Sequence, residues 1–308
     1  MIKLKNIISF FVSVVVIVLI VFNWEFITET VEDLIYSRRE VIIPDANLYE
    51  KDYEFMYFKE SKDFIPRNYD DLVSIFYTTL DKGWKEFTFY CDTEYEDCLE
   101  DVALISNDQK FLAEINNFVH PYNSYSTIKT LYDDTGKITI MIDKLYSDED
   151  IDKIDKDIDI WINDYVRANM NDKDKIKAMH DAIINRTKYD KVRADTNNSK
   201  YDSARINGLL YDHYAICSGY TDMMAVVLSK LGIPNYKIAS EEHVWNAVYL
   251  DGKWYHLDLT WDDPLTTSGK NMLLHDYFLI NDSELTRLDM EKSKRDHIYN
   301  RDIYLEFN

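Results

Sequence analysis

The first element that the hydrophobic pattern predicts is a membrane-spanning helix at the start of the chain. Positions 6–24 carry no charge and are mostly Val, Ile, Phe or Leu, a run long enough to cross a bilayer as a helix. A cleaved signal peptide would end in small residues, whereas this run ends in Trp24. Lys3 and Lys5 precede the run and acidic residues follow it, so the positive-inside rule places the short N-terminus in the cytoplasm. We therefore predict an uncleaved transmembrane anchor over 1–25 and a single-pass cell-membrane protein whose C-terminal bulk is extracytoplasmic.

Downstream of this run, the pattern predicts a spacer and then a small domain that mixes helices and strands. Residues 26–52 are charged and have no clean period, which is typical of a juxtamembrane spacer. Two alternating runs, 127–132 and 137–142, flank the turn sequence Asp-Asp-Thr-Gly and predict a hairpin. The signals before it are a helix over 69–80, a strand over 84–90 and a helix over 107–118. We assign residues 53–146 to an α+β domain.

A second domain, over 147–308, begins with two amphipathic helices. Ser147 and Asp150 form an N-terminal capping pair, and apolar residues follow at helical spacing. Acidic residues surround this helix and lysines are interleaved with them, so a solvated face fits better than a calcium site. The next helix spans 173–185 and has one apolar side.

The composition predicts folded domains and argues against nucleic acid as a partner. The chain is 46% hydrophobic and 14% aromatic and has only 7 Gly and 5 Pro, so most of it should be ordered. Its formal net charge is −21, whereas nucleic-acid binding needs clustered Lys and Arg that release counterions. The negative charge either attracts basic substrates electrostatically or belongs to a solvated acidic surface that only keeps the protein soluble.

The cysteines predict one disulfide and one unpaired thiol. The chain has 3 cysteines, and cysteines outside the cytoplasm usually pair. Cys91 ends a strand-like segment and Cys98 lies in the helix-like segment that follows, which could bring the two together. We predict a disulfide between them, the alternative being two buried free thiols. Cys217 is then left unpaired.

Cys217 also occupies the start of a third predicted helix, which is a position that can activate a thiol. This helix runs to Leu231 and stops at Gly232 and Pro234. Unpaired N–H groups and the positive end of the helix dipole favour an anion there, in this case a thiolate. Taken alone the cysteine is weak support for function, because buried structural cysteines are common.

A hairpin downstream supplies the base and the carboxylate that a thiol nucleophile needs. An alternating run ends in an Asp-Gly turn that pairs Leu250 with Lys253. In this register His243 and Asp258 share a face at a Cβ separation of roughly 7 to 8 Å, whereas a one-residue slip would separate them. The imidazole would move the thiol proton and the carboxylate would orient the ring. A packed histidine and a strand-end cap are the alternative, which we disfavour because all three required residue types occur in order.

Three strings surround these residues, namely Ile216-Cys217-Ser218-Gly219-Tyr220, His243-Val244-Trp245-Asn246 and Trp254-Tyr255-His256-Leu257-Asp258-Leu259-Thr260-Trp261-Asp262-Asp263-Pro264. Together they resemble bacterial transglutaminase-like proteins. Residues 175–190 and Tyr277-Phe278-Leu279-Ile280 are similar to the same proteins, so the resemblance covers about 170–285.

This resemblance implies a papain-like α+β core in which the nucleophile helix packs on an antiparallel sheet. The smaller α+β domain and the transmembrane helix would precede this core. The resemblance also implies Cys217 as nucleophile, His243 as general base and acid and Asp258 as orienting carboxylate, with no cofactor and no metal. The chain departs from the family before the nucleophile, where Asn207 and His213 replace a common aromatic residue and a glycine.

That departure bears on the oxyanion hole, the pair of donors that would stabilise the charged intermediate. The backbone N–H of Cys217 is the first donor that we expect. Asn207, Tyr201 and Tyr211 are candidates for the second.

The sequence therefore predicts an extracytoplasmic thiol acyl-transfer enzyme, similar to a protease or amidase, that acts on amide bonds of peptides or proteins, including cell-wall peptide. Transglutaminase-type cross-linking and an inactive binding module of the same fold are the alternatives. A zinc site of Cys217, His243, His256 and Asp258 is disfavoured, because the hairpin places His256 beyond Asp258 from the strand end. The expected partners are the substrate and, through the first helix, the membrane.

Overall fold

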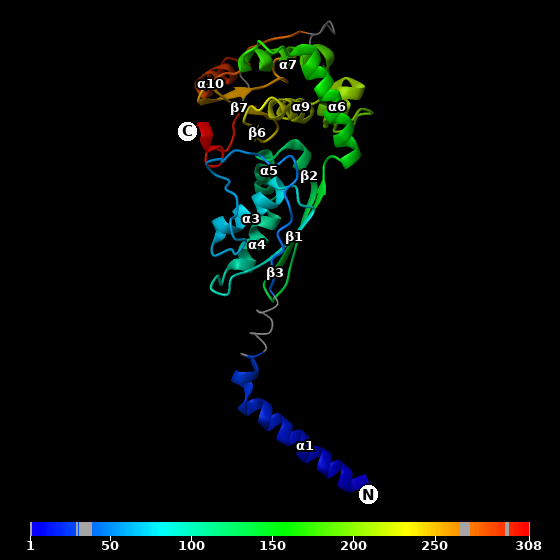
Figure 1. Cartoon of the computed structure of the whole chain (residues 1–308), viewed down its shortest axis with the longest axis vertical. Helices are drawn as coiled ribbons and strands as arrows, with labels where there is room; N and C mark the ends of the chain where they lie inside the picture. Colours follow the sequence, from blue (N-terminus) through cyan, green and yellow to red (C-terminus); the bar gives the residue numbers. More distant parts are fainter. Residues whose placement is uncertain (1, 29, 31–38, 265–271, 293–295, 308) are drawn as a thin grey trace. The chain divides into compact units, whose positions relative to one another are not determined.

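The structure is a computed structural model that describes residues 2–28, 30, 39–264, 272–292 and 296–307 (Figure 1). The chain divides into two compact units, Met1–Ile42 and Ile43–Asn308. The second unit contains both helices and antiparallel sheets, so the predicted α+β class is confirmed.

The predicted helix at the start of the chain is present as α1, Ile2–Phe22. Its side chains from Ser9 to Phe22 are exposed. Within the described residues, no helix combines the length and the apolar character that crossing a membrane requires. The helix is thus confirmed, but its prediction as a transmembrane anchor over 1–25 is not supported. The predicted spacer over 26–52 lies partly outside the described residues.

Residues 43–146 build a three-stranded antiparallel sheet with helices packed on it. The strands lie in the order β1-β3-β2, namely Glu86–Tyr90, Lys137–Lys144 and Tyr125–Tyr132. β2 and β3 form the predicted hairpin, and α3 and α4 pack on this sheet. The helices are α3 Tyr69–Asp81, α4 Cys98–Asn107, α5 Gln109–Asn117 and a 3-10 turn Pro121–Asn123. Asp108 separates α4 from α5, because its side chain accepts from the N–H of Phe111 at 2.9 Å and so begins a new helix.

The predicted disulfide between Cys91 and Cys98 is confirmed, with the two Cα atoms 5.9 Å apart. It joins the residue after β1 to the first residue of α4. All three cysteine positions are described, and Cys217 is the unpaired one.

Replacing both Cys91 and Cys98 with serine is expected to lower the free energy of unfolding by about 2 to 3 kcal/mol, because the bridge closes a short loop in the unfolded chain. Denaturant unfolding of the oxidised protein and of the double variant measures this difference. Peptide mapping without reductant should recover the two cysteines joined, and a bridge from either one to Cys217 would contradict the pairing.

Residues 147–308 contain a second antiparallel sheet, of order β6-β7-β8, with helices on it. The strands are Asn235–Ala239, Val244–Leu250 and Lys253–Leu257. The helices are α6 Asp148–Tyr165, α7 Asp172–Arg186, α8 Lys191–Thr196, α9 Cys217–Lys230 and α10 Asp282–Glu291. Shorter elements are a parallel pair of β4 Lys188–Tyr189 with β5 Tyr214–Ala215, a π-helical turn Gly208–Asp212 and a 3-10 turn Leu305–Phe307. α9 packs on β6 and β7, as the predicted core requires.

Buried contacts join the two halves of the second unit. The rings of Phe118 and Tyr236 stack 4.6 Å apart. The Lys237 ammonium donates to Asp222 of α9 at 2.9 Å, and the hydroxyl of Tyr146 donates to the other carboxylate oxygen of Asp222 at 2.9 Å. Because a buried charge is costly unless it is paired, this network ties α9 to β6 and to the end of the first sheet region. The division into domains over 53–146 and 147–308 stays a prediction.

Candidate active site

Cys217 is the first residue of α9, and a neighbouring loop fixes its position. Ile216 has an extended backbone, and no side chain caps the helix start, so the first N–H groups have no side-chain partner there. The N–H of Ile216 donates to the carbonyl of Ser203 at 2.8 Å, and the hydroxyl of Ser218 donates to the carbonyl of Ala204 at 2.9 Å. A Cβ at Gly219 would lie 2.6 Å from the Ser203 carbonyl oxygen, so glycine permits this close approach.

The hairpin of β7 and β8 has the predicted register. Leu250 pairs with Lys253 across the turn, where Asp251 and Gly252 have positive φ values of 51° and 81°. His243 immediately precedes β7 and Asp258 immediately follows β8, as their bounds show.

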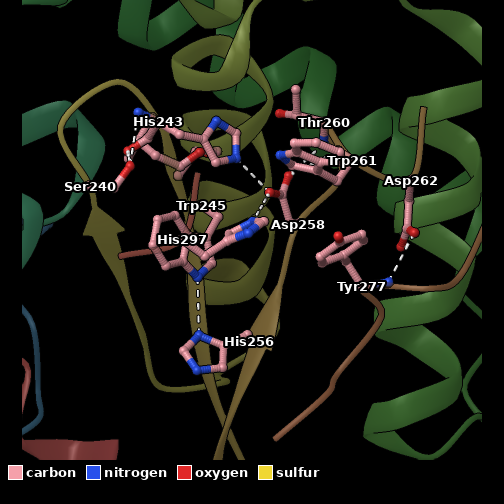
Figure 2. A network of polar contacts seen from close by, with 12 residues as sticks. Ser240, His243, Trp245, His256, Asp258, Thr260, Trp261, Asp262, Tyr277 and His297 are labelled. Carbon is pink, nitrogen blue, oxygen red and sulfur yellow. Dashed lines mark hydrogen bonds and ion pairs between the residues drawn. The ribbon is translucent and has the colours of Figure 1, made fainter. Parts of the chain in front are cut away.

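The register brings His243 and Asp258 together (Figure 2), with the imidazole Nε2 2.5 Å from the carboxylate Oδ2. Burial acts to lower the pKa of His243, but the charge and hydrogen bond of Asp258 and the neighbouring Cys217 raise it to about 10. Burial acts to raise the pKa of Asp258, yet His243 and His297 hold it well below its usual range. Asp258 therefore stabilises the imidazolium that forms when the His243 ring takes a proton.

Both carboxylate oxygens of Asp258 accept hydrogen bonds, each from two donors. Oδ1 accepts from the backbone N–H groups of Thr260 and Trp261, at 2.8 and 3.2 Å. Oδ2 accepts from His243 and also from the Nε2 of His297, at 2.9 Å. His297 was not predicted from the sequence, because it lies beyond the region of family resemblance and in no periodic segment.

A cleft exposes Cys217 and His243 to one side of the second unit. The residues that line it include the acidic Glu242, Asp263 and Asp296 and the basic Arg193. Tyr189 also lines the cleft. Burial is the main cause that raises the pKa of this phenol to about 12, and the proximity of Cys217 is the second. Tyr189 is thus a protonated hydroxyl beside the candidate nucleophile.

The three predicted second donors of an oxyanion hole are occupied elsewhere and do not line this cleft. The amide of Asn207 donates to Asp150 at 2.8 Å, and the hydroxyl of Tyr211 donates to Asp157 at 2.9 Å. The ring of Tyr201 stacks on Tyr214 at 4.1 Å. These expectations were wrong because α6, which begins far upstream, supplies the partners of two of them. Tyr189 is the hydroxyl that the fold places in the cleft instead.

The zinc set considered from the sequence is not assembled either. His256 lies within β8, and its Nδ1 accepts from the indole N–H of Trp245 at 3.0 Å. The ligand atoms of His243, Asp258 and His297 do converge within 4.8 Å of one another and could in principle hold a metal ion. Hydrogen bonds between these groups already account for their convergence.

Part of the chain matches a known sequence family. Residues 161–259, which include Cys217, His243 and Asp258, match the sequence model of the transglutaminase-like superfamily. The match covers the part of the chain that carries the three candidate residues, about a third of its length. No curated protein sequence matches the chain significantly.

Two solved structures are similar to the chain over part of its length. The first is a crystal structure of a TGase, with a TM-score of 0.34 and 18% identity over 44% of each chain. The second is the protein called "Putative Cysteine Protease" from Cytophaga hutchinsonii, with a TM-score of 0.27, 14% identity and coverage of 48% of this chain and 65% of the other. The chain thus spans less than half of the first structure and just under two thirds of the second.

Proposed function

We propose that the protein is a thiol acyl-transfer enzyme that hydrolyses peptide amide bonds. Cys217 is the nucleophile, His243 the general base and then acid, and Asp258 the carboxylate that orients the imidazole. The observation that carries this proposal is the hydrogen bond from the half-buried His243 to Asp258, beside a thiol that opens to the same cleft.

The proposed steps follow from these positions. His243 takes the Sγ proton of Cys217, and the thiolate attacks the amide carbon to form a tetrahedral oxyanion. The backbone N–H of Cys217 and the hydroxyl of Tyr189 are the donors available to that oxyanion. His243 returns the proton to the leaving amine, the C–N bond breaks, and a thioester remains on Cys217. Water, activated by the same imidazole, then releases the acid and the free thiol.

The disulfide supports a location outside the cytoplasm, since structural disulfides persist mainly in oxidising compartments. Cell-wall peptides and surface proteins are the amide-bearing polymers available there. An amine in place of water would complete a transglutaminase-type cross-link from the same thioester.

The proposal is tested by incubating the full chain with peptide pools, with and without a primary amine, and following products and Cys217 adducts by mass spectrometry. We expect a peptide thioester on Cys217, cleaved peptides in water and no effect of a chelator. Wild-type protein that binds peptides but turns none over would favour a binding module. Stoichiometric zinc that is lost on replacing Cys217 would favour a metal site.

A further inference from the structure

His297 is a second imidazole on the carboxylate of the candidate triad. Its Nε2 lies 2.9 Å from Asp258 Oδ2, and its Nδ1 lies 2.7 Å from Asp289 Oδ1 on α10. Figure 2 shows His297 approaching Asp258 beside His243. Oδ2 of Asp258 therefore accepts hydrogen bonds from both imidazoles, those of His243 and His297.

Both nitrogens of this ring contact carboxylates. An ionised carboxylate can only accept hydrogen bonds, and both nitrogens of His297 face carboxylate oxygens. A ring that carries hydrogen on both nitrogens satisfies both contacts at once. Imidazole and carboxylate groups therefore alternate from His243 through Asp258 and His297 to Asp289.

The surroundings hold His297 rigidly. Its side chain is fully buried, the Tyr277 ring stacks on it at 5.2 Å, and the Trp245 ring meets it edge-on at 4.8 Å. A buried ring packed between aromatic side chains, with a carboxylate at each nitrogen, has one available orientation.

We propose that His297 is a positioning residue that aims the Asp258 carboxylate at His243 and keeps it ionised, an inference that rests on the proposed function. Without His297, one of the four donors to Asp258 is lost, and only His243 remains on Oδ2. The carboxylate can then rotate about its side-chain bond, and the imidazole that it orients loses its fixed direction toward the thiol.

The test must separate this role from general support of the fold. The titratable groups that face Asp258 or its partners are His243 before β7, His297, Tyr189 of β4, Tyr277, Asp289 of α10, Cys217 of α9 and His256 of β8. His256 is a matched control, because it is a buried histidine in the same region whose polar partners are Trp245 and Asp282.

The experiment measures the rate of Cys217 alkylation by iodoacetamide across pH in the full chain, together with kcat and KM on any peptide that the wild type cleaves. His297→Leu should lower the alkylation rate in mildly acidic buffer and kcat by about 10- to 100-fold, as loss of a supporting partner commonly does, with little change in KM. The acid limb of both profiles should move to higher pH, since Asp258 loses a donor that holds its pKa down.

Two further variants keep the test decisive if His297→Leu fails to fold. His297→Gln places an amide donor near the Nε2 position and should retain most of the wild-type rate, whereas Asp289→Asn should shift the acid limb in the same direction as His297→Leu. His256→Leu should leave the profile unchanged. Folded His297 variants with the wild-type profile, an equal shift in His256→Leu, or zinc bound through His297 would overturn the inference. A wild-type thiol no more reactive than that of His243→Ala would instead defeat the proposed function.

Discussion

Replacing Cys217 with alanine is expected to abolish turnover, slowing it by at least about 10⁴-fold, on the order seen when a covalent nucleophile is removed. No other described residue in the cleft offers a thiol to form the thioester. The fold should remain, because the side chain is small and partly exposed, so the free energy of unfolding should change by less than about 1 kcal/mol. Peptide cleavage assays and denaturant unfolding measure the two effects.

The serine double variant at Cys91 and Cys98 is the matched control, because it removes two sulfur atoms outside the cleft. It should be less stable than the wild type yet retain turnover per folded molecule. Residual wild-type turnover in Cys217→Ala would assign the chemistry to another group.

Replacing Asp258 with asparagine is expected to slow turnover by about 10³- to 10⁴-fold with a smaller effect on KM, comparable to the loss in a serine-protease triad. The reason is that every partner of this carboxylate is a donor. An asparagine must point its own N–H₂ at two of them, either at the imidazoles or at the backbone N–H groups. In the first orientation His243 must change its tautomer, and in the second the loop after β8 must move.

The same variant should also change how stability depends on pH. The depressed pKa of Asp258 contributes stability that is present above its unfolded value of about 3.9 and is lost as pH falls below that value. The raised pKa of His243 contributes stability that is complete below its unfolded value of about 6.5 and is lost as pH rises toward about 10.

The stability difference between wild type and Asp258→Asn should therefore be largest between about pH 4 and 6.5 and should shrink on both sides. Denaturant unfolding across pH measures it. Asp222→Asn is a control at another buried carboxylate, paired with Lys237, and should lose stability while retaining more turnover than Asp258→Asn. Equal losses of turnover in the two variants would mean that the effect is structural.

Local signals in the sequence were sufficient to predict the central pair of the site. The Asp-Gly turn demands positive φ at two consecutive residues, which favours a two-residue hairpin, and strand alternation then decides which residues share a face. His243 and Asp258 follow from those two constraints. The predicted hairpin over 127–142 and the capping box at Ser147 were confirmed for the same reason, since each depends on residues close in sequence.

Contacts between distant segments were not predictable in this way. His297 reaches Asp258 from 39 positions further along the chain, through an irregular segment that has no period. Tyr189 lies in a strand of only two residues, which pairs with β5 after a long excursion and leaves no alternating pattern to detect. The misassigned Asn207 and Tyr211 are polar residues whose partners on α6 could not be inferred from spacing.

The close approach of the Ser203 carbonyl to Gly219 has a consequence for which changes the site can tolerate. Adding a single methyl group at position 219 would push that carbonyl away, and the same carbonyl accepts the hydrogen bond that holds Ile216 in place ahead of Cys217. The orientation of the Cys217 thiol thus depends on the close packing of the Ser203 backbone against Gly219, as well as on the charged groups around the thiol. Gly219 has no side chain and no titratable group, yet a substitution there would disturb the geometry of the candidate site.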